Sequence, residues 1–187
     1  MLIDHFAPPR SHPLHPFVLC IFRLRARGAF RTETILPKGN VDILFNLGPP
    51  ERVSALRGTF ECATTLVTGL HTRAIVVTPG RNVHIVGVSL RPETCSALLH
   101  APAGDFTDTF IDGSLVLSDA DRLLNRLAES ATFAEQRDVL LAWLLRRVQP
   151  DDNTALVAYA SRLLRGTLGA GAVGLAARRI GMSRRHL

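Results

Sequence analysis

Histidine is the residue type with the widest chemical scope in this chain, because there are seven of them and imidazole is a common metal ligand. Metal-binding β-barrels often place two histidines as H-x-H on one strand, with a glutamate and a later histidine. Here His71 and His84 each stand alone. Three others fall in a proline-rich N-terminal segment: His5, His12 and His15. We therefore expect no metal ion and no other cofactor, and the pairing of His84 with Glu33 or Glu61 is the one left to check.

Covalent catalysis needs an activated nucleophile, and the sequence has no local motif for one. It lacks G-x-S-x-G, the strand-to-helix turn that exposes a catalytic serine. The three cysteines lack C-x-x-C spacing, which favours buried reduced thiols over a zinc site or disulfides: Cys20, Cys62 and Cys95. We therefore predict that the protein is not an enzyme and that it is cytoplasmic.

Asp42, Phe45 and His84 are the candidate ligand-binding residues, and each also has a structural interpretation. Asp42 lies in an apolar strand after a turn, where its carboxylate would face a ligand or accept from the backbone amides of residues 37–40. We favour the second role for Asp42. Phe45 would line a pocket or fill the interior of a barrel.

The positive charge is concentrated at the end of the chain. The 187 residues have a net charge of +6, and Lys38 is the only lysine among 22 basic residues. Residues 1–150 carry 16 basic and 14 acidic side chains, whereas residues 151–187 carry six arginines against two aspartates. A basic segment after a nearly neutral body indicates a polyanionic partner, although solvated arginine faces would give the same composition.

Residues 17–90 have the composition of short β-strands. Six segments are rich in branched and aromatic side chains: 17–22, 30–36, 41–47, 64–70, 74–78 and 83–90. Proline and glycine turn signals separate several of them. Strands about ten residues apart, without helices between them, indicate an antiparallel barrel or sandwich.

Residues 92–148 have helical patterns. Pro92 is well placed for the first turn of a short helix that ends near His100. Two pairs have the spacing of capping boxes: Ser118 with Asp121, and Thr132 with Glu135. The helix after Thr132 has an apolar stripe that would pack against a core: Val139, Leu140, Trp143 and Leu144.

Residues 149–152 break the helical pattern and are interpreted as a linker. Asn153 is expected to cap the next helix, which would end near Gly166. Its apolar face would contain Leu156, Val157, Ala160, Leu163 and Leu164. No apolar run approaches the roughly 20 residues that span a bilayer, so we expect no membrane partner.

The last segment has the pattern of a helix-turn-helix. Ala177 permits close helix crossing, Gly181 allows a positive φ in the turn, and Ser183 can cap the second helix. Val173 and Leu187 are the outer apolar anchors. The early positions of the second helix, where DNA contacts occur, are basic: Arg184, Arg185 and His186.

These motifs are similar to those of a known family. The pattern V-x-x-A-A-x-x-x-G-M-S-x-R-H-L at 173–187 resembles the first helix-turn-helix of AraC-type transcriptional regulators. ILPKGNVDILFNLG at 35–48 resembles the I-L-P-x-G-x-x-D-L-x-F-N-x-G signature of one N-terminal sensor domain in that family. The stretch at 87–93 and the pair Thr107-Asp108 fit the same domain.

The resemblance implies an α+β fold in which an N-terminal antiparallel cupin-like β-barrel is followed by α-helices and a partial helix-turn-helix. Residues 1–148 would be the sensor or dimerisation domain, with the barrel over about 1–90 and helices over about 92–148. Residues 149–152 would be the linker, and 153–187 would begin the DNA-binding domain. The implied partners are promoter DNA, a small-molecule effector, RNA polymerase and a second copy of the chain.

The resemblance also assigns roles to single residues. Ser183 would cap the recognition helix, Arg185 would contact a base edge, and Arg184 a phosphate. Two further arginines would contact backbone phosphates: Arg178 and Arg179. In the family an Arg and a Phe usually follow the residue that matches Leu187, so we expect this chain to be a truncated regulator. The alternative is a stand-alone cupin-like metal-binding protein or enzyme.

Overall fold

The computed structural model describes residues 2–28, 32–55, 58–62, 64–79, 81–149, 152–166, 169, 171–183 and 185. The chain forms two compact units, Met1–Val148 and Gln149–Leu187. The first unit contains all the strands and the first helices, and the second contains two helices. Each unit is described separately below.

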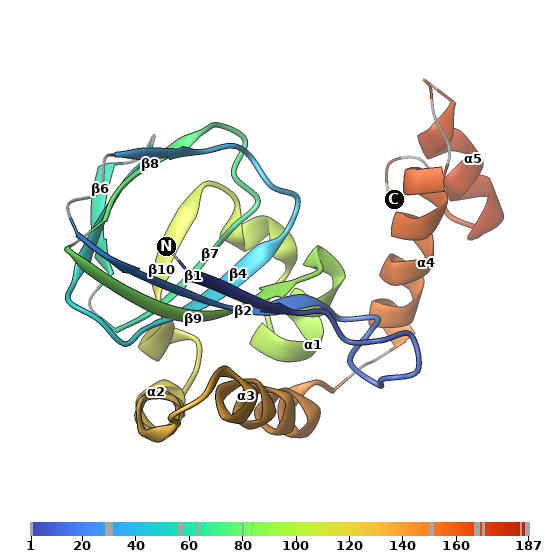
Figure 1. Cartoon of the computed structure of the whole chain (residues 1–187). Helices are drawn as coiled ribbons and strands as arrows, with labels where there is room; N and C mark the ends of the chain where they lie inside the picture. Colours follow the sequence, from blue (N-terminus) through green and yellow to red (C-terminus); the bar gives the residue numbers. More distant parts are fainter. Residues whose placement is uncertain are drawn as a thin grey trace. The chain divides into compact units, whose positions relative to one another are not determined.

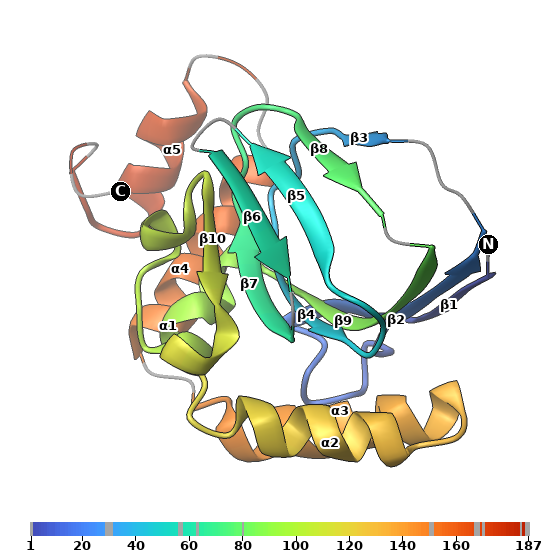
Figure 2. The same ribbon diagram turned by 90° about the vertical axis from the view of Figure 1, so that its left-hand side faces the viewer.

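Two antiparallel sheets form the first unit and face each other around a central space (Figures 1 and 2). The larger sheet has six strands in the order β1 (Leu2–Phe6), β2 (Val18–Arg27), β9 (Asn82–Leu90), β4 (Val41–Asn46), β7 (Thr65–Gly69) and β10 (Thr109–Asp112). The smaller sheet has the order β3 (Glu33–Ile35), β8 (Ile75–Thr78), β5 (Glu51–Ala55) and β6 (Gly58–Cys62). The fold is therefore α+β with an antiparallel barrel, as the sequence predicted.

Six strands match the segments expected from the sequence, and four were missed. The missed strands are short and carry many polar residues: β1, β5, β6 and β10. They lie at or near the edges of the two sheets, where a strand needs less apolar surface. Strand β2 also runs to Arg27, five residues beyond the expected end.

Strand β4 shows how the sequence builds a barrel with two different faces. Its side chains alternate in direction, as in any strand. Val41, Ile43 and Phe45 are fully buried in the main hydrophobic core. Asp42 and Leu44 point the other way and line the space between the sheets. The large sheet therefore packs one face on helices and turns the other toward the barrel interior.

Short helical segments connect the barrel to the helices that cover it. A 3-10 turn at Pro92–Thr94 leads into α1 (Cys95–Leu99), which confirms the helix expected after Pro92. Two more 3-10 turns, Ala103–Phe106 and Gly113–Leu115, flank β10. Helices α2 (Ala120–Glu129) and α3 (Phe133–Arg147) then lie along the outer face of the large sheet (Figure 1).

One of the two expected capping boxes forms. The Thr132 side chain accepts a hydrogen bond from the amide of Glu135, whose carboxylate accepts from the Thr132 amide, so the prediction for α3 is confirmed. The prediction for Ser118 is wrong, because Asp119 is the N-cap of α2 and makes no side-chain cap. The Asp119 carboxylate instead accepts hydrogen bonds from Trp143 and Arg147 of α3.

The apolar stripe of α3 packs on the large sheet as expected. Leu140, Trp143 and Leu144 are buried in the main core. Phe45 of β4 meets the Trp143 ring edge to face, with ring centroids 6.5 Å apart and an interplanar angle of 88°. Such aromatic pairs add to the stability that burial alone provides. Phe45 is thus part of the sheet–helix contact.

The second unit contains α4 (Asp152–Gly166) and α5 (Ala172–Arg179), which contact each other. Helix α4 includes Asn153, the residue expected to precede it as the cap. The expected apolar face of α4 is only partly covered, because Ala160 is buried while Leu156 and Val157 are exposed. The eight-residue α5 is too short to cover the whole of the longer helix. Within the described residues, neither these helices nor the others have the length and apolar character needed to cross a membrane.

Candidate functional site

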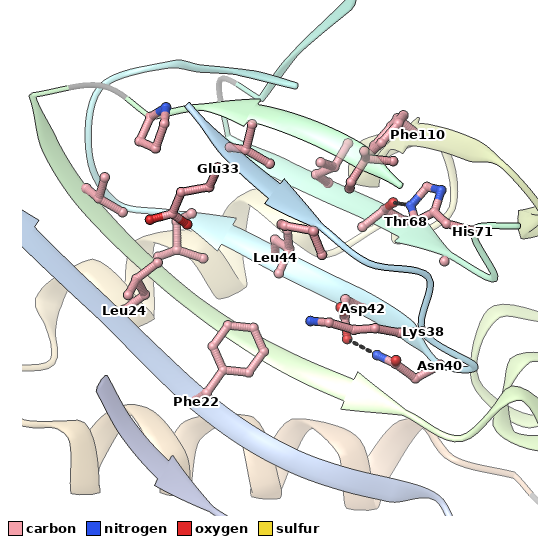
Figure 3. Close-up of a pocket in the computed structure, with 18 of the residues that line it drawn as sticks. Phe22, Leu24, Glu33, Lys38, Asn40, Asp42, Leu44, Thr68, His71 and Phe110 are labelled. Carbon is pink, nitrogen blue, oxygen red and sulfur yellow. Dashed lines mark hydrogen bonds between the residues drawn. The ribbon is translucent and has the colours of Figure 1, made fainter. Parts of the chain in front are cut away.

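The barrel encloses a cavity of about 240 Å³ between its two sheets (Figure 3). Alternate side chains of β2, β4, β7 and β9 form one wall, and residues of β3 and β8 form the opposite wall. Most lining side chains are apolar, for example Phe22, Leu24, Leu44, Ile75, Ile85 and Phe110. A largely apolar cavity with a few polar groups is the usual form of a small-molecule site.

Asp42 and Glu33 are the carboxylates among the lining residues, and Asp42 is the more buried of the two. Its Oδ1 accepts hydrogen bonds from Asn40 Nδ2 and Ser89 Oγ, both at 2.5 Å. The prediction that Asp42 would bond the turn amides of residues 37–40 is therefore wrong, since its two partners are side chains. Burial raises the pKa of Asp42, while the Ser89 hydrogen bond, the Lys38 charge and the Asn40 hydrogen bond oppose that shift.

Lys38 brings a positive charge to the same end of the cavity. It lies in the connection between β3 and β4, and its side chain extends toward Asp42 and Asn40 (Figure 3). Lys38 is exposed, so solvent reaches this end of the cavity. Lys38 and Asp42 together place opposite charges there without a direct ion pair among the contacts of the described residues.

His71 completes the polar end and is not isolated, as it seemed to be from the sequence. Its Nε2 lies 2.7 Å from Thr68 Oγ1, and its Nδ1 lies 3.9 Å from Asp108 Oδ1. Its ring lies 5.0 Å from that of Phe110. Burial lowers the pKa of His71, and the Asp108 and Asp42 carboxylates oppose that shift. The imidazole is thus fixed by its neighbours at the cavity wall.

Strained backbone surrounds His71. Leu70 and Asp108 both have left-handed φ values, 47° and 52°, which cost a residue with a side chain about 1–2 kcal/mol. The Asp108 carboxylate accepts hydrogen bonds from the Thr72 amide at 2.8 Å and the Thr72 hydroxyl at 2.6 Å, which stabilise this conformation. Strain of this kind is concentrated at functional sites. In the sequence, the only feature that pointed to Asp108 was the pair Thr107-Asp108, which was noted through the family resemblance.

The other two ligand candidates do not face the cavity. Phe45 is buried against Trp143 on the opposite face of β4. His84 alternates with the cavity residues Val83 and Ile85 on β9 and is not among the lining residues. Burial, together with the charges of Arg25 and Arg23, lowers the pKa of His84. Both residues are therefore corrections to the expected ligand-binding set.

The structure gives no metal centre in its described part. Glu33 lines the cavity whereas His84 does not, and no ion pair joins His84 to Glu33 or Glu61 among the described residues. Among the described residues no group of three or more histidine, cysteine, aspartate or glutamate side chains could hold a metal ion. Cys20 and Cys95 are free thiols whose pKa values are raised by burial, to about 12 for Cys95, so neither is an activated nucleophile.

The expected DNA-binding residues are only partly described. Helix α5 ends in a Schellman motif, in which the Met182 amide bonds the Ala177 carbonyl and the Gly181 amide bonds that of Arg178. Gly181 has φ +70°, as its place in the predicted turn requires, and Ala177 is buried. Three basic side chains on either side of this turn are exposed: Arg178 and Arg179 in the last turn of α5, and Arg185 after Gly181.

Several helix-turn-helix predictions remain untested or need correction. Arg184, His186 and Leu187 lie outside the described residues. No helix follows Ser183 in the part of the chain that the structure describes, so its role as the cap of a recognition helix stays a prediction. Val173 is 46% exposed, so the expectation that it anchors the motif in a core is not met here. What the structure describes of the motif is α5 and the turn at Gly181 that ends it.

Comparisons with known proteins give one family match. Residues 5–112 match the family described as "Domain of unknown function (DUF6597)". No curated protein matches the chain. The structural matches include the AraC-like transcriptional activator CuxR, at 16% identity over 100% of this chain and 78% of that chain, with a TM-score of 0.40.

Two other solved structures illustrate the range of the matches. ToxT from Vibrio cholerae, in its apo K231A form, is 9% identical over 89% of this chain and 72% of that chain, with a TM-score of 0.48. Protein NMB1881 from Neisseria meningitidis is 11% identical over 48% of this chain and 82% of that chain, with a TM-score of 0.35. Likeness at this level does not establish a function for the present chain.

Proposed function

Because the chain belongs to the DUF6597 family, whose description names no activity, we propose its function from its own residues: a transcription regulator of the AraC type that senses a small molecule. The observation that carries this proposal is the cavity of the barrel, which joins apolar walls to a polar end at Lys38, Asp42 and His71. The sensor signature at 35–48 supplies Lys38, Asn40 and Asp42 of that polar end.

The second unit supports the DNA-binding part of the proposal. Helix α5 ends in a Schellman turn at Gly181, which is compatible with the first helix and turn of a helix-turn-helix. Arg185, directly after this turn, is exposed, and arginine to guanine is the commonest specific base contact. In this proposal the exposed Arg178 and Arg179 contact phosphates, which position a protein on DNA without reading sequence.

The proposal also names the partners of the protein: an effector, promoter DNA, a second copy of the chain and RNA polymerase. The effector would bind in the cavity, promoter DNA would bind the second unit, and the protein would act in the cytoplasm as a homodimer in contact with RNA polymerase. In this proposal the protein is not an enzyme. Two observations support that view: in the cavity, His71 is held by Thr68 and Phe110, and outside the cavity burial raises the pKa of the free thiols Cys20 and Cys95.

Selection of DNA sequences by the complete gene product tests the proposal. The protein is incubated with a random duplex library, and bound DNA is sequenced over successive rounds. We expect enrichment of a discrete motif, and Arg185→Ala should weaken binding to it by about 1–3 kcal/mol. Arg122→Ala is the matched control, since it removes an exposed arginine of α2 in the first unit.

The outcomes of this experiment are distinct. Equal loss by Arg185→Ala on selected and random DNA would make Arg185 a phosphate contact rather than a base contact. No enrichment of any sequence by the complete gene product would refute the proposed function.

A further inference from the structure

The cavity has two parts of different chemistry, and its size limits what can fill it. Its body is lined by aliphatic and aromatic side chains. Lys38, Asn40 and Asp42 lie at one end, and the carboxylate of Glu33 lies away from them (Figure 3). An apolar cavity of about 150 Å³ binds benzene. At about 240 Å³ this one is roughly one and a half times as large, which corresponds to about ten non-hydrogen atoms.

Two polar groups at this end are left without partners, whereas the others are satisfied. Thr68 and His71 bond each other, and Oδ1 of Asp42 accepts from both Asn40 and Ser89. Among the described residues no donor bonds Oδ2 of Asp42, and no acceptor bonds the ammonium of Lys38. The free cavity therefore presents one open acceptor and one open donor at the same end.

We propose that this cavity binds an uncharged, mainly apolar molecule of about ten non-hydrogen atoms whose single hydroxyl group bridges Oδ2 of Asp42 and Nζ of Lys38. The inference rests on the proposed function, since it takes the cavity as the effector site. A hydroxyl group both donates and accepts, so it matches an acceptor and a donor placed side by side. The apolar body would occupy the space between Phe22, Leu44 and Phe110.

The charge balance at the polar end disfavours ionised ligands. A carboxylate would gain from Lys38 but lie against the Asp42 carboxylate, and an ammonium group would meet the reverse situation. His71 adds no third charge, because burial lowers its pKa and keeps the ring neutral near pH 7. A charged ligand group would thus lose its hydration, and its attraction to one of the two charges would be offset by repulsion from the other.

A matched set of four probes tests the proposal on the full chain. They are 3-phenylpropan-1-ol, propylbenzene, 3-phenylpropanoate and 3-phenylpropylamine, which share one apolar skeleton and differ only in the head group. Dissociation constants are measured by isothermal titration calorimetry. We expect the alcohol to bind at least fivefold more tightly than each of the other three.

Two variants separate the head-group contacts from general apolar binding. Lys38→Met should weaken binding of the alcohol about fivefold and leave binding of propylbenzene within twofold. Arg73→Met is the matched control, because Arg73 is likewise an exposed cation but is not among the residues that line the cavity. It should leave both dissociation constants unchanged.

Asp42→Asn tests independently whether the hydroxyl group of the ligand contacts Asp42. It should weaken binding of the alcohol about tenfold, and circular dichroism checks that the variant is folded. If it does not fold, Lys38→Met and the four-probe series still decide the question.

Each outcome bears on one claim. Equal binding of propylbenzene and the alcohol, or tighter binding of the carboxylate or the amine, overturns the inferred ligand class while the cavity remains a binding site. Failure of all four probes also overturns the inference. None of these results alters whether the complete gene product selects a DNA motif, so the proposed function is judged separately.

Discussion

Asp119 is the carboxylate on which the contact between α2 and α3 depends, and Asp119→Ala tests this directly. Its Oδ2 accepts from Trp143 Nε1 and its Oδ1 from Arg147 Nη1, both at 2.9 Å. Removing the carboxylate leaves the indole N–H of a side chain that is 3% exposed without a partner. That orphaned donor costs about 1–3 kcal/mol, and the partly exposed Arg147 pair adds about 1 kcal/mol. The expected loss in the free energy of unfolding is therefore about 3 kcal/mol.

The assay uses the single tryptophan of the chain. Trp143 lies at the altered contact, so its fluorescence reports unfolding of the first unit in urea. With a urea dependence of about 2 kcal/mol per molar, the midpoint should fall by about 1.5 M. Arg122→Ala is the matched control, because this arginine also approaches Asp119, at 3.8 Å, but its side chain is 80% exposed. It should shift the free energy by less than about 0.5 kcal/mol. Equal midpoints for the two variants would refute the reasoning.

Three further predictions concern the cavity, the capping box and pH. Gly87→Ala should abolish the thermal shift given by 3-phenylpropan-1-ol, because its Cβ would lie 2.5 Å from Phe22 Cζ and push that ring into the cavity; Gly104→Ala, whose Cβ meets nothing within 4 Å, should not. Thr132→Ala should lower the free energy of unfolding by about 1 kcal/mol in urea titrations, whereas Ser118→Ala should not change it. The pKa of His71 is lowered from 6.5 by burial, so its contribution to stability is present above pH 6.5 and is lost as pH falls through the lower folded value. Urea midpoints from pH 8 to pH 5 should therefore fall less steeply in His71→Gln than in the native chain, and identical slopes would contradict the burial argument.

Local patterns in the sequence predicted those features whose causes are local. The capping box at Thr132 needs only residues within one turn, and the stripe on α3 repeats with the helical period. The long strands have enough branched residues to be recognised. Gly181 has the positive φ that its position in the turn predicted.

Features that depend on distant residues were not predictable in the same way. Asp42 bonds Ser89, 47 residues away, and this contact exists only because β4 pairs with β9. His71 acquires its role through Asp108, on a segment 37 residues later. Ser118 has the spacing of a cap, but the bonds of Asp119 to α3 fix the start of α2 one residue later. In each case tertiary pairing decided between local alternatives of similar energy.

The two faces of β4 show why the candidate site was only partly found. Alternation alone places Asp42 and Phe45 on opposite faces, yet it does not say which face is the cavity. The helices α2 and α3, which cover the face of Phe45, settle that choice. Asp42 therefore lines the cavity, whereas Phe45 packs against Trp143 on the other face of β4.

The central claim, regulation of transcription by this protein, is tested most directly by deleting its gene and measuring transcripts genome-wide. The account predicts that a small set of transcripts changes and that the DNA upstream of them contains the motif selected by the complete gene product. No change in transcripts, or changes at genes without that motif, would contradict the account.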